Sequence, residues 1–184
     1  MVEIRWHGRG GQGAVTSAGL LAEAAIDEGK YAQAFPSFGP ERRGAPVAAY
    51  VRIDATKPIR VRAEVLQPDV VIVFDAGLLR SVPVALGLKE RGMLILNTRK
   101  SPEEIQHQFG GSLQVAVVDA SKIAMEVLGV PIVNTTMVGA LLKATGIVKL
   151  DSLLEPLQHR FGKLAGRNID AMKRAYAETR VRCP

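Results

Sequence analysis

The segment "DVVIVFD", residues 69–75, is the feature that most restricts the fold of this chain. Between its two aspartates it is a continuous run of β-branched and aromatic side chains. Such a run is typical of a strand that is buried on both faces inside a parallel sheet, because a half-exposed strand would alternate apolar with polar residues. Parallel neighbours need long crossover connections, which are usually helical, so the chain should alternate strands with helices.

The remaining sequence follows this alternation. Besides residues 69–75, strands are predicted at residues 1–7, 47–53, 93–97 and 113–119, with short additional strands at 57–65 and 130–134. Helices are predicted from residue 14 to a cap at Gly29, through residues 86–92, and at residues 101–109, 120–129, 134–146, 151–161 and 168–180. Residues 31–48 contain three prolines and two glycines, and we expect a long loop there.

These elements predict an α/β fold for a single domain of residues 1–184. Its centre should be a doubly wound, mostly parallel sheet with helices on both faces and further helices at the C-terminal end. The start of the helix at residue 101 has the strongest local signal. Ser101 and Glu104 form a capping-box pattern, and Pro102 stands at the first helical position.

Composition limits the partners of the chain. No apolar run approaches the roughly 20 residues of a membrane span, and a strand pattern begins at once without a cleavable leader, so we expect a cytoplasmic protein without a membrane partner. The net charge of +6 is scattered, without a basic run among aromatics, so no nucleic-acid partner is expected. The single cysteine, Cys183, excludes a disulfide framework or an iron–sulfur cluster held by this chain alone.

The turn "GRGGQG" after the first strand is the clearest candidate for a binding site. Gly8, Gly10 and Gly13 satisfy the G-x-G-x-x-G pattern between a strand and a helix, where glycines allow close backbone approach and the helix N-terminus attracts phosphate. The acidic residue that binds the ribose of NAD about 20 positions later is absent, which disfavours NAD. In the alternative interpretation, the glycines only let the helix and strand pack closely.

Arginines should gather near this turn. Arg9, Arg42, Arg43 and the group from Asn97 to Lys100 lie at or near the ends of predicted strands, and guanidinium groups suit phosphate oxygens. Catalytic groups are much weaker candidates. His7 stands beside the glycine turn without a neighbouring nucleophile, and Asp75 at the strand end is more typical of a helix cap than of an acid–base catalyst. This chain alone does not resemble a complete enzyme.

Several segments together resemble a known family. "GRGGQG", "SFGPERRGAP", "PDVVIVFD", "LKERGMLILNT" and "NTTMVGALLKATG" are similar, in this order, to the gamma subunit, or the equivalent fused domain, of the 2-oxoacid:ferredoxin oxidoreductases that act on pyruvate, ketoisovalerate and 2-oxoglutarate. The family usually has Tyr-Gly-Pro-Glu-Met-Arg-Gly-Gly in the loop, whereas this chain has Phe38, Arg42 and Ala45.

The resemblance implies a role within a complex. In this family thiamine diphosphate is bound by the alpha and beta components, and iron–sulfur clusters on beta and delta pass electrons to ferredoxin. The gamma component has no redox centre. The complex couples oxidative decarboxylation of a 2-oxoacid, here pyruvate or a branched-chain 2-oxoacid, to acyl transfer onto coenzyme A. We therefore expect alpha, beta and delta subunits as partners and a coenzyme A site shared with them.

The predicted coenzyme A site combines the glycine turn with polar residues of the long loop and of later strand ends. The candidates are Gly8, Arg9, Gly10, Gly11, Gln12, Gly13, Ser37, Arg42, Arg43, Asn97, Thr98, Asn134 and Thr135. No catalytic residue and no metal ligand is expected. Two alternatives remain open: a free-standing Rossmann-like oxidoreductase that binds a nucleotide, and a purely structural subunit.

Overall fold

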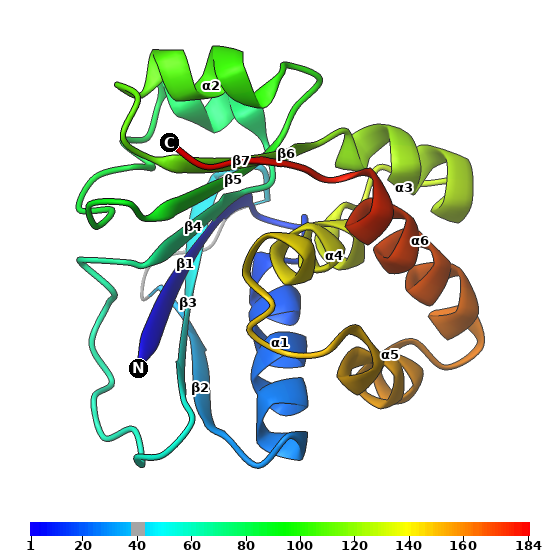
Figure 1. Ribbon diagram of the computed structural model, residues 1–184. Helices are drawn as coiled ribbons and strands as arrows, with labels where there is room; N and C mark the ends of the chain where they lie inside the picture. The colour runs from blue at the N-terminus through cyan, green and yellow to red at the C-terminus, as the bar shows by residue number, and fades with distance from the viewer. Residues whose placement is uncertain (38–42) are drawn as a thin grey trace.

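A computed structural model describes residues 1–37 and 43–184. Its centre is a seven-stranded sheet with the order β2-β3-β1-β4-β5-β6-β7 (Figure 1). The strands β1, β4, β5 and β6 run parallel to one another, and β3 and β7 run antiparallel to their neighbours. The strands are β1 Val2–Arg9, β2 Tyr31–Pro36, β3 Pro46–Asp54, β4 Val70–Val73, β5 Met93–Asn97, β6 Gln114–Val118 and β7 Arg180–Arg182.

Helices cover the two faces of the sheet unequally. Figure 1 shows α1 and α4 to α6 together on one face and α2 on the other. The α-helices are α1 Ala14–Asp27, α2 Pro102–Gln108, α3 Ala120–Leu128, α4 Asn134–Thr145, α5 Leu154–Phe161 and α6 Ala165–Glu178. The 3₁₀ helices are η1 Ala76–Arg80, η2 Leu150–Leu153 and η3 Gly162–Leu164. The predicted fold class, with helices on both faces, is confirmed.

The alternation of buried residues along the central strands explains the two faces. Ile72 of β4 belongs to the larger core, which includes residues of α1, α3, α4, α5 and α6. Its neighbours Val71 and Val73 belong to the smaller core with Leu78 and Ile105. The side chains of Val71, Ile72 and Val73 are fully buried, as the unbroken apolar run predicts for a strand covered on both sides.

The predicted start of α2 at Ser101 and the predicted end of α1 at Gly29 are both confirmed. Ser101 Oγ accepts from the Glu104 amide at 3.2 Å, and the Glu104 carboxylate accepts from the Ser101 amide at 2.7 Å. Gly29 has a positive φ of 79° after α1. The amides of Gly29 and Lys30 donate to the carbonyls of Ile26 and Ala25, which is the Schellman pattern of a glycine-terminated helix.

Four expected elements are wrong. Residues 31–36 form the edge strand β2 instead of part of a loop, and Ala32 and Ala34 of this strand pack against the larger core. Residues 57–65 form no strand, because the Arg52 side chain, rather than a neighbouring strand, donates to their carbonyls. Residues 86–92 form turns, not a helix, and residues 130–133 have no strand pairing. The strand β7, which has only three residues, was not predicted.

Among the helices of the described residues, none has the length and apolar character needed to cross a membrane. The five candidates or motif residues Phe38, Gly39, Pro40, Glu41 and Arg42 lie outside the described part of the chain.

Candidate functional site

The order of the strands places a crevice between β1 and β4. After β1 the chain continues to β2 and β3 on one side, whereas after β4 it continues to β5 and β6 on the other. In open α/β sheets, ligands bind at the carboxyl ends of the strands where the order reverses in this way. The structure has a cavity of about 860 Å³ there, within the usual range for small-molecule sites.

Residues from both halves of the sheet line this cavity, which we call the switch-point cleft. The glycine turn, the long loop and the ends of β4, β5 and β6 all contribute, together with the segment before α4. The lining residues are Gly10, Gly11, Gln12, Arg43, Phe74, Asp75, Ala76, Asn97, Thr98, Arg99, Asp119, Ser121, Pro131, Ile132 and Val133. Six of them, Gly10, Gly11, Gln12, Arg43, Asn97 and Thr98, are predicted site residues.

The glycine turn is held in a fixed shape by its own hydrogen bonds. Gln12 Oε1 accepts from the Arg9 amide at 2.7 Å, and the Gln12 amide donates to the Arg9 carbonyl at 2.9 Å. The Gly10 amide donates to the carbonyl of Ala45 at 2.9 Å, which ties the turn to the end of the long loop. Gln12 therefore shapes the turn, a role that the glycine pattern alone does not indicate.

Of the two glycines in this turn that have a positive φ, only Gly13 belongs to the G-x-G-x-x-G pattern. Gly11 has φ 96° and Gly13 has φ 84°, a region that side-chain-bearing residues rarely adopt. A Cβ on Gly13 would lie 3.0 Å from Asn134 Cβ, so this glycine also allows α4 to approach the turn. A Cβ on Gly8 would make only ordinary contacts with Ala14 and Phe74.

The N-terminus of α1 faces the turn without a capping side chain. Gly13 is its N-cap, no side chain bonds to the cap, and the first turn contains no acidic residue. The first amides of a helix have no partner within the helix and form the positive end of its dipole. This arrangement suits a bound anion, as the strand–turn–helix sequence predicts.

Positive charge at the cleft is partly neutralised by carboxylates. Arg9 Nε lies 2.5 Å from Asp75 Oδ2, and Arg99 Nε lies 3.0 Å from Asp119 Oδ2. Within the described residues, Arg43 forms no ion pair and lines the cleft with an exposed side chain. Asp75 also caps η1 by accepting from the Gly77 amide at 2.7 Å, so the expected capping role is confirmed.

Asn97 and Thr98 differ in their availability to a ligand. Asn97 Nδ2 donates to the Phe74 carbonyl and to Ser121 Oγ, both at 2.8 Å, and its Oδ1 accepts from the Ser121 amide. Asn97 is thus fully engaged in joining β4, β5 and α3. Thr98 Oγ1 accepts from the Lys100 amide at 3.2 Å and lies at the cleft with a half-buried side chain.

Among the candidates in the described part of the chain, Ser37, Asn134 and Thr135 do not line the cleft. Thr135 is fully buried, and its hydroxyl bonds to Asn168 Oδ1 at 3.1 Å. Asn134 lines a separate cavity of about 180 Å³ beside Ile132. Ser37 follows the edge strand β2, and its hydroxyl bonds to Glu64 at 3.1 Å.

The other nine lining residues were not among the predicted site residues: Phe74, Asp75, Ala76, Arg99, Asp119, Ser121, Pro131, Ile132 and Val133. Phe74, Asp75 and Asp119 end predicted strands, and Ala76, Arg99 and Ser121 closely follow them, so their place near a strand end was the available signal. Val133 precedes α4 in a segment that was predicted as a strand.

His7 stands at the end of β1 but is not a candidate catalyst. It is 9% exposed, and its Nε2 accepts from Arg5 Nε at 3.1 Å. Burial, followed by the charge of Arg5, lowers its pKa from the ordinary 6.5 to about 4. His7 is therefore neutral near neutral pH and acts as a buried hydrogen-bond acceptor.

The depressed pKa of His7 predicts a pH-dependent stability. Between about pH 6.5 and pH 4 the unfolded chain binds a proton that the folded chain does not, so stability falls as pH falls, by up to about 3 kcal/mol in total. Above about pH 6.5 His7 is neutral in both the folded and the unfolded chain, so this histidine no longer changes the stability with pH. Urea unfolding across this range should give a steeper loss for the wild type than for His7→Gln, whose amide oxygen can still accept from Arg5. Equal slopes would contradict the assignment.

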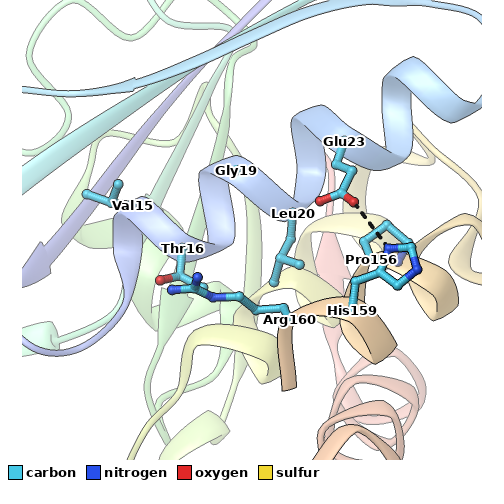
Figure 2. Close-up of a pocket in the computed structure, with 8 residues that line it drawn as sticks. All are labelled: Val15, Thr16, Gly19, Leu20, Glu23, Pro156, His159 and Arg160. Carbon is cyan, nitrogen blue, oxygen red and sulfur yellow. Dashed lines mark ion pairs between the residues drawn. The ribbon is translucent and has the colours of Figure 1, made fainter. Parts of the chain in front are cut away.

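A second groove lies between α1 and α5 (Figure 2), with a volume of about 510 Å³. Its lining includes Thr16, Glu23, His159 and Arg160. His159 lies 4.0 Å from Glu23 and 3.8 Å from Glu155, and its side chain is 68% exposed. Exposed pairs of this kind contribute little energy, and nothing in this groove resembles a phosphate-binding turn.

Comparisons with known proteins agree with the fold and the motifs. The family described as "Pyruvate ferredoxin/flavodoxin oxidoreductase" matches residues 3–178. The "Pyruvate/ketoisovalerate oxidoreductases common subunit gamma" of Pyrococcus furiosus is 53% identical over 183 residues, covering 98% of each chain.

Two solved structures extend this comparison. The crystal structure of pyruvate oxidoreductase subunit PORC from Thermotoga maritima matches with a TM-score of 0.86 and 41% identity, covering 98% of this chain and 97% of that one. The 2-oxoglutarate:ferredoxin oxidoreductase from Magnetococcus marinus shares the fold with a TM-score of 0.77 at 22% identity, covering 96% of this chain and 30% of that one. The chain therefore belongs to the pyruvate ferredoxin/flavodoxin oxidoreductase family.

Proposed function

We propose that this chain is the gamma subunit of a pyruvate or branched-chain 2-oxoacid:ferredoxin oxidoreductase and that it binds coenzyme A at the switch-point cleft. The relatives are named as subunits of such enzymes and match along almost the whole chain. Thiamine diphosphate and the iron–sulfur clusters belong to the alpha, beta and delta subunits in this proposal. The chain itself has one cysteine and offers no cysteine set for a cluster.

The observation that carries this proposal is a glycine turn and Arg43 lining one cleft, with the uncapped N-terminus of α1 directly after that turn. Helix N-termini and arginines favour the binding of phosphate groups. Coenzyme A has a pyrophosphate and a separate 3′-phosphate. An enzyme that contains this fold, from Magnetococcus marinus, has a structure with coenzyme A and succinyl-CoA bound. That likeness supports coenzyme A as the class of ligand.

The part of this chain in the reaction is then binding and orientation. The Gly11 amide and Arg43, which both belong to residues lining the cleft, would hold phosphates, while the Arg9–Asp75 and Arg99–Asp119 pairs limit the net charge of the cleft. Partner subunits supply the reacting centre, and the bound coenzyme A presents its thiol to them. Holding one reactant in a fixed position makes acyl transfer effectively intramolecular.

Replacing Arg43 by alanine should weaken coenzyme A binding by about 10-fold or more, because one charged hydrogen-bonding partner is lost. Calorimetry on the assembled complex measures this effect, with coenzyme A and NADH titrated in parallel. Arg160→Ala is the matched control, since Arg160 is an exposed arginine in the other groove.

The outcomes separate the alternatives. Loss of binding in Arg160→Ala but not in Arg43→Ala would move the site to the α1–α5 groove and overturn the proposal. Binding of NADH in preference to coenzyme A would favour the nucleotide-dependent oxidoreductase. If the complex binds neither molecule through this chain, the chain is a purely structural subunit.

A further inference from the structure

The face of the sheet that carries α2 has an unusual covering beside β1 and β3. Residues 55–69, the turquoise trace after β3 in Figure 1, and residues 81–92 lie there without an α-helix or a strand. Two buried arginines of the sheet, Arg5 at 8% and Arg52 at 3% exposure, hold these segments by their backbone carbonyls.

Arg5 joins the two segments to each other. Its guanidinium donates to the carbonyl of Val65 at 3.2 Å and to those of Val84 and Leu86 at 3.0 and 2.5 Å. Gly87 lies so close to the Leu66 carbonyl that a Cβ there would overlap it. The backbones at residues 65–66 and 84–87 are therefore adjacent and fixed in position.

This arrangement turns two leucines outward. Val65 and Val84 are buried beneath the segments, whereas the neighbouring Leu66 and Leu86 are 74% and 70% exposed. These are the largest exposed fractions among the exposed large hydrophobic residues of the described chain. Exposed leucines on two adjacent segments with a fixed backbone favour an interaction site, because a preorganised surface loses little entropy on binding.

We call this pair of leucines the Leu66–Leu86 patch, and positive charge lies on the same segment as Leu66. Lys57, Arg60 and Arg62 of the same segment are exposed, and within the described residues none of them forms an ion pair. A partner that covers the patch would gain from carboxylates placed opposite these cations.

We propose that the Leu66–Leu86 patch is a docking surface for a neighbouring subunit of the same complex, which presents apolar side chains edged by carboxylates. This inference rests on the proposed role as a subunit. It adds a location: the assembly contact lies on the irregular layer over β1 and β3, away from the face covered by α1 and α4 to α6.

The test compares complexes purified after co-expression of the chain with its partner subunits. Leu66→Glu combined with Leu86→Glu should reduce the assembled fraction at least 10-fold, because it places two carboxylates against an acidic-edged partner. Leu164→Glu is the matched control, since Leu164 is 60% exposed in η3, on the helical face. Circular dichroism and the fluorescence of Trp6, the single tryptophan, check that each variant is folded.

Each outcome decides a different point. Normal assembly of the double variant overturns the patch while leaving the subunit role intact. Loss of assembly only in Leu164→Glu places the contact on the helical face and also overturns it. A wild-type chain that does not join its partners overturns the subunit role and the patch together. If the isolated chain forms dimers that the double variant abolishes, the occupant is a second copy rather than another subunit.

Discussion

Replacing Arg5 by alanine should lower the free energy of unfolding by about 3 kcal/mol or more. The guanidinium donates to three backbone carbonyls and to His7 Nε2. Without it, these buried acceptors lose their donor, and each unsatisfied group costs about 1 kcal/mol or more. Burial also lowers the pKa of Arg5, because the charged guanidinium loses contact with water.

Urea unfolding followed by Trp6 fluorescence measures this loss. Arg60→Ala is the control, because Arg60 is an exposed arginine on the segment that the buried arginines hold. Arg5→Lys is a second useful variant, since lysine keeps the charge but cannot reach separate carbonyls with one planar group. A loss in Arg5→Ala no larger than in Arg60→Ala would show that these bonds do not stabilise the layer.

Gly139→Ala should also destabilise the chain by about 3 kcal/mol, through steric overlap. Gly139 lies in α4 where this helix crosses α6, and a Cβ there would overlap the carbonyl oxygen of Met172 and lie 3.0 Å from its carbonyl carbon. The obstructing atoms belong to the backbone, so the two helices must move apart. That movement would open the larger core, in which Met172 is fully buried.

The contrast with another helical glycine isolates this effect. Gly19 in α1 has nothing within 4 Å of an added Cβ. Alanine there should stabilise the chain by about 0.5–1 kcal/mol, since glycine weakens a helix interior. Thermal unfolding of both variants gives the comparison, and a stabilised Gly139→Ala would mean that α4 and α6 are not in close contact.

The sequence was most informative where one local pattern determines the structure. The apolar run of β4, the capping box at Ser101 and the Schellman glycine at residue 29 each depend on neighbouring residues, and all three are confirmed. The edge strand β2 and the short strand β7 depend on pairing with distant residues, and both were missed. Residues 57–65 resemble a strand, but a side chain from β3 takes the place of a neighbouring strand.

In the candidate site, too, features set by the order of elements could be predicted, whereas features set by contacts between distant residues could not. The position of the glycine turn at the switch point follows from the order of elements, and the cleft lies there. The pairing of Arg9 with Asp75 and of Arg99 with Asp119 joins residues that are far apart in sequence, so the reduced net charge of the cleft could not be predicted. The burial of Thr135 against α6 likewise depends on how the helices pack.

The walls of the switch-point cleft come from segments that are far apart in the sequence. Gly10 to Gln12 form one wall, and Pro131 to Val133, more than a hundred residues later, form another. A partly folded chain cannot offer both walls at once, so any molecule that fills the cleft is recognised only by the completed domain. Such a molecule would shift the equilibrium toward the native chain in proportion to the logarithm of its concentration and would slow proteolysis of newly made protein.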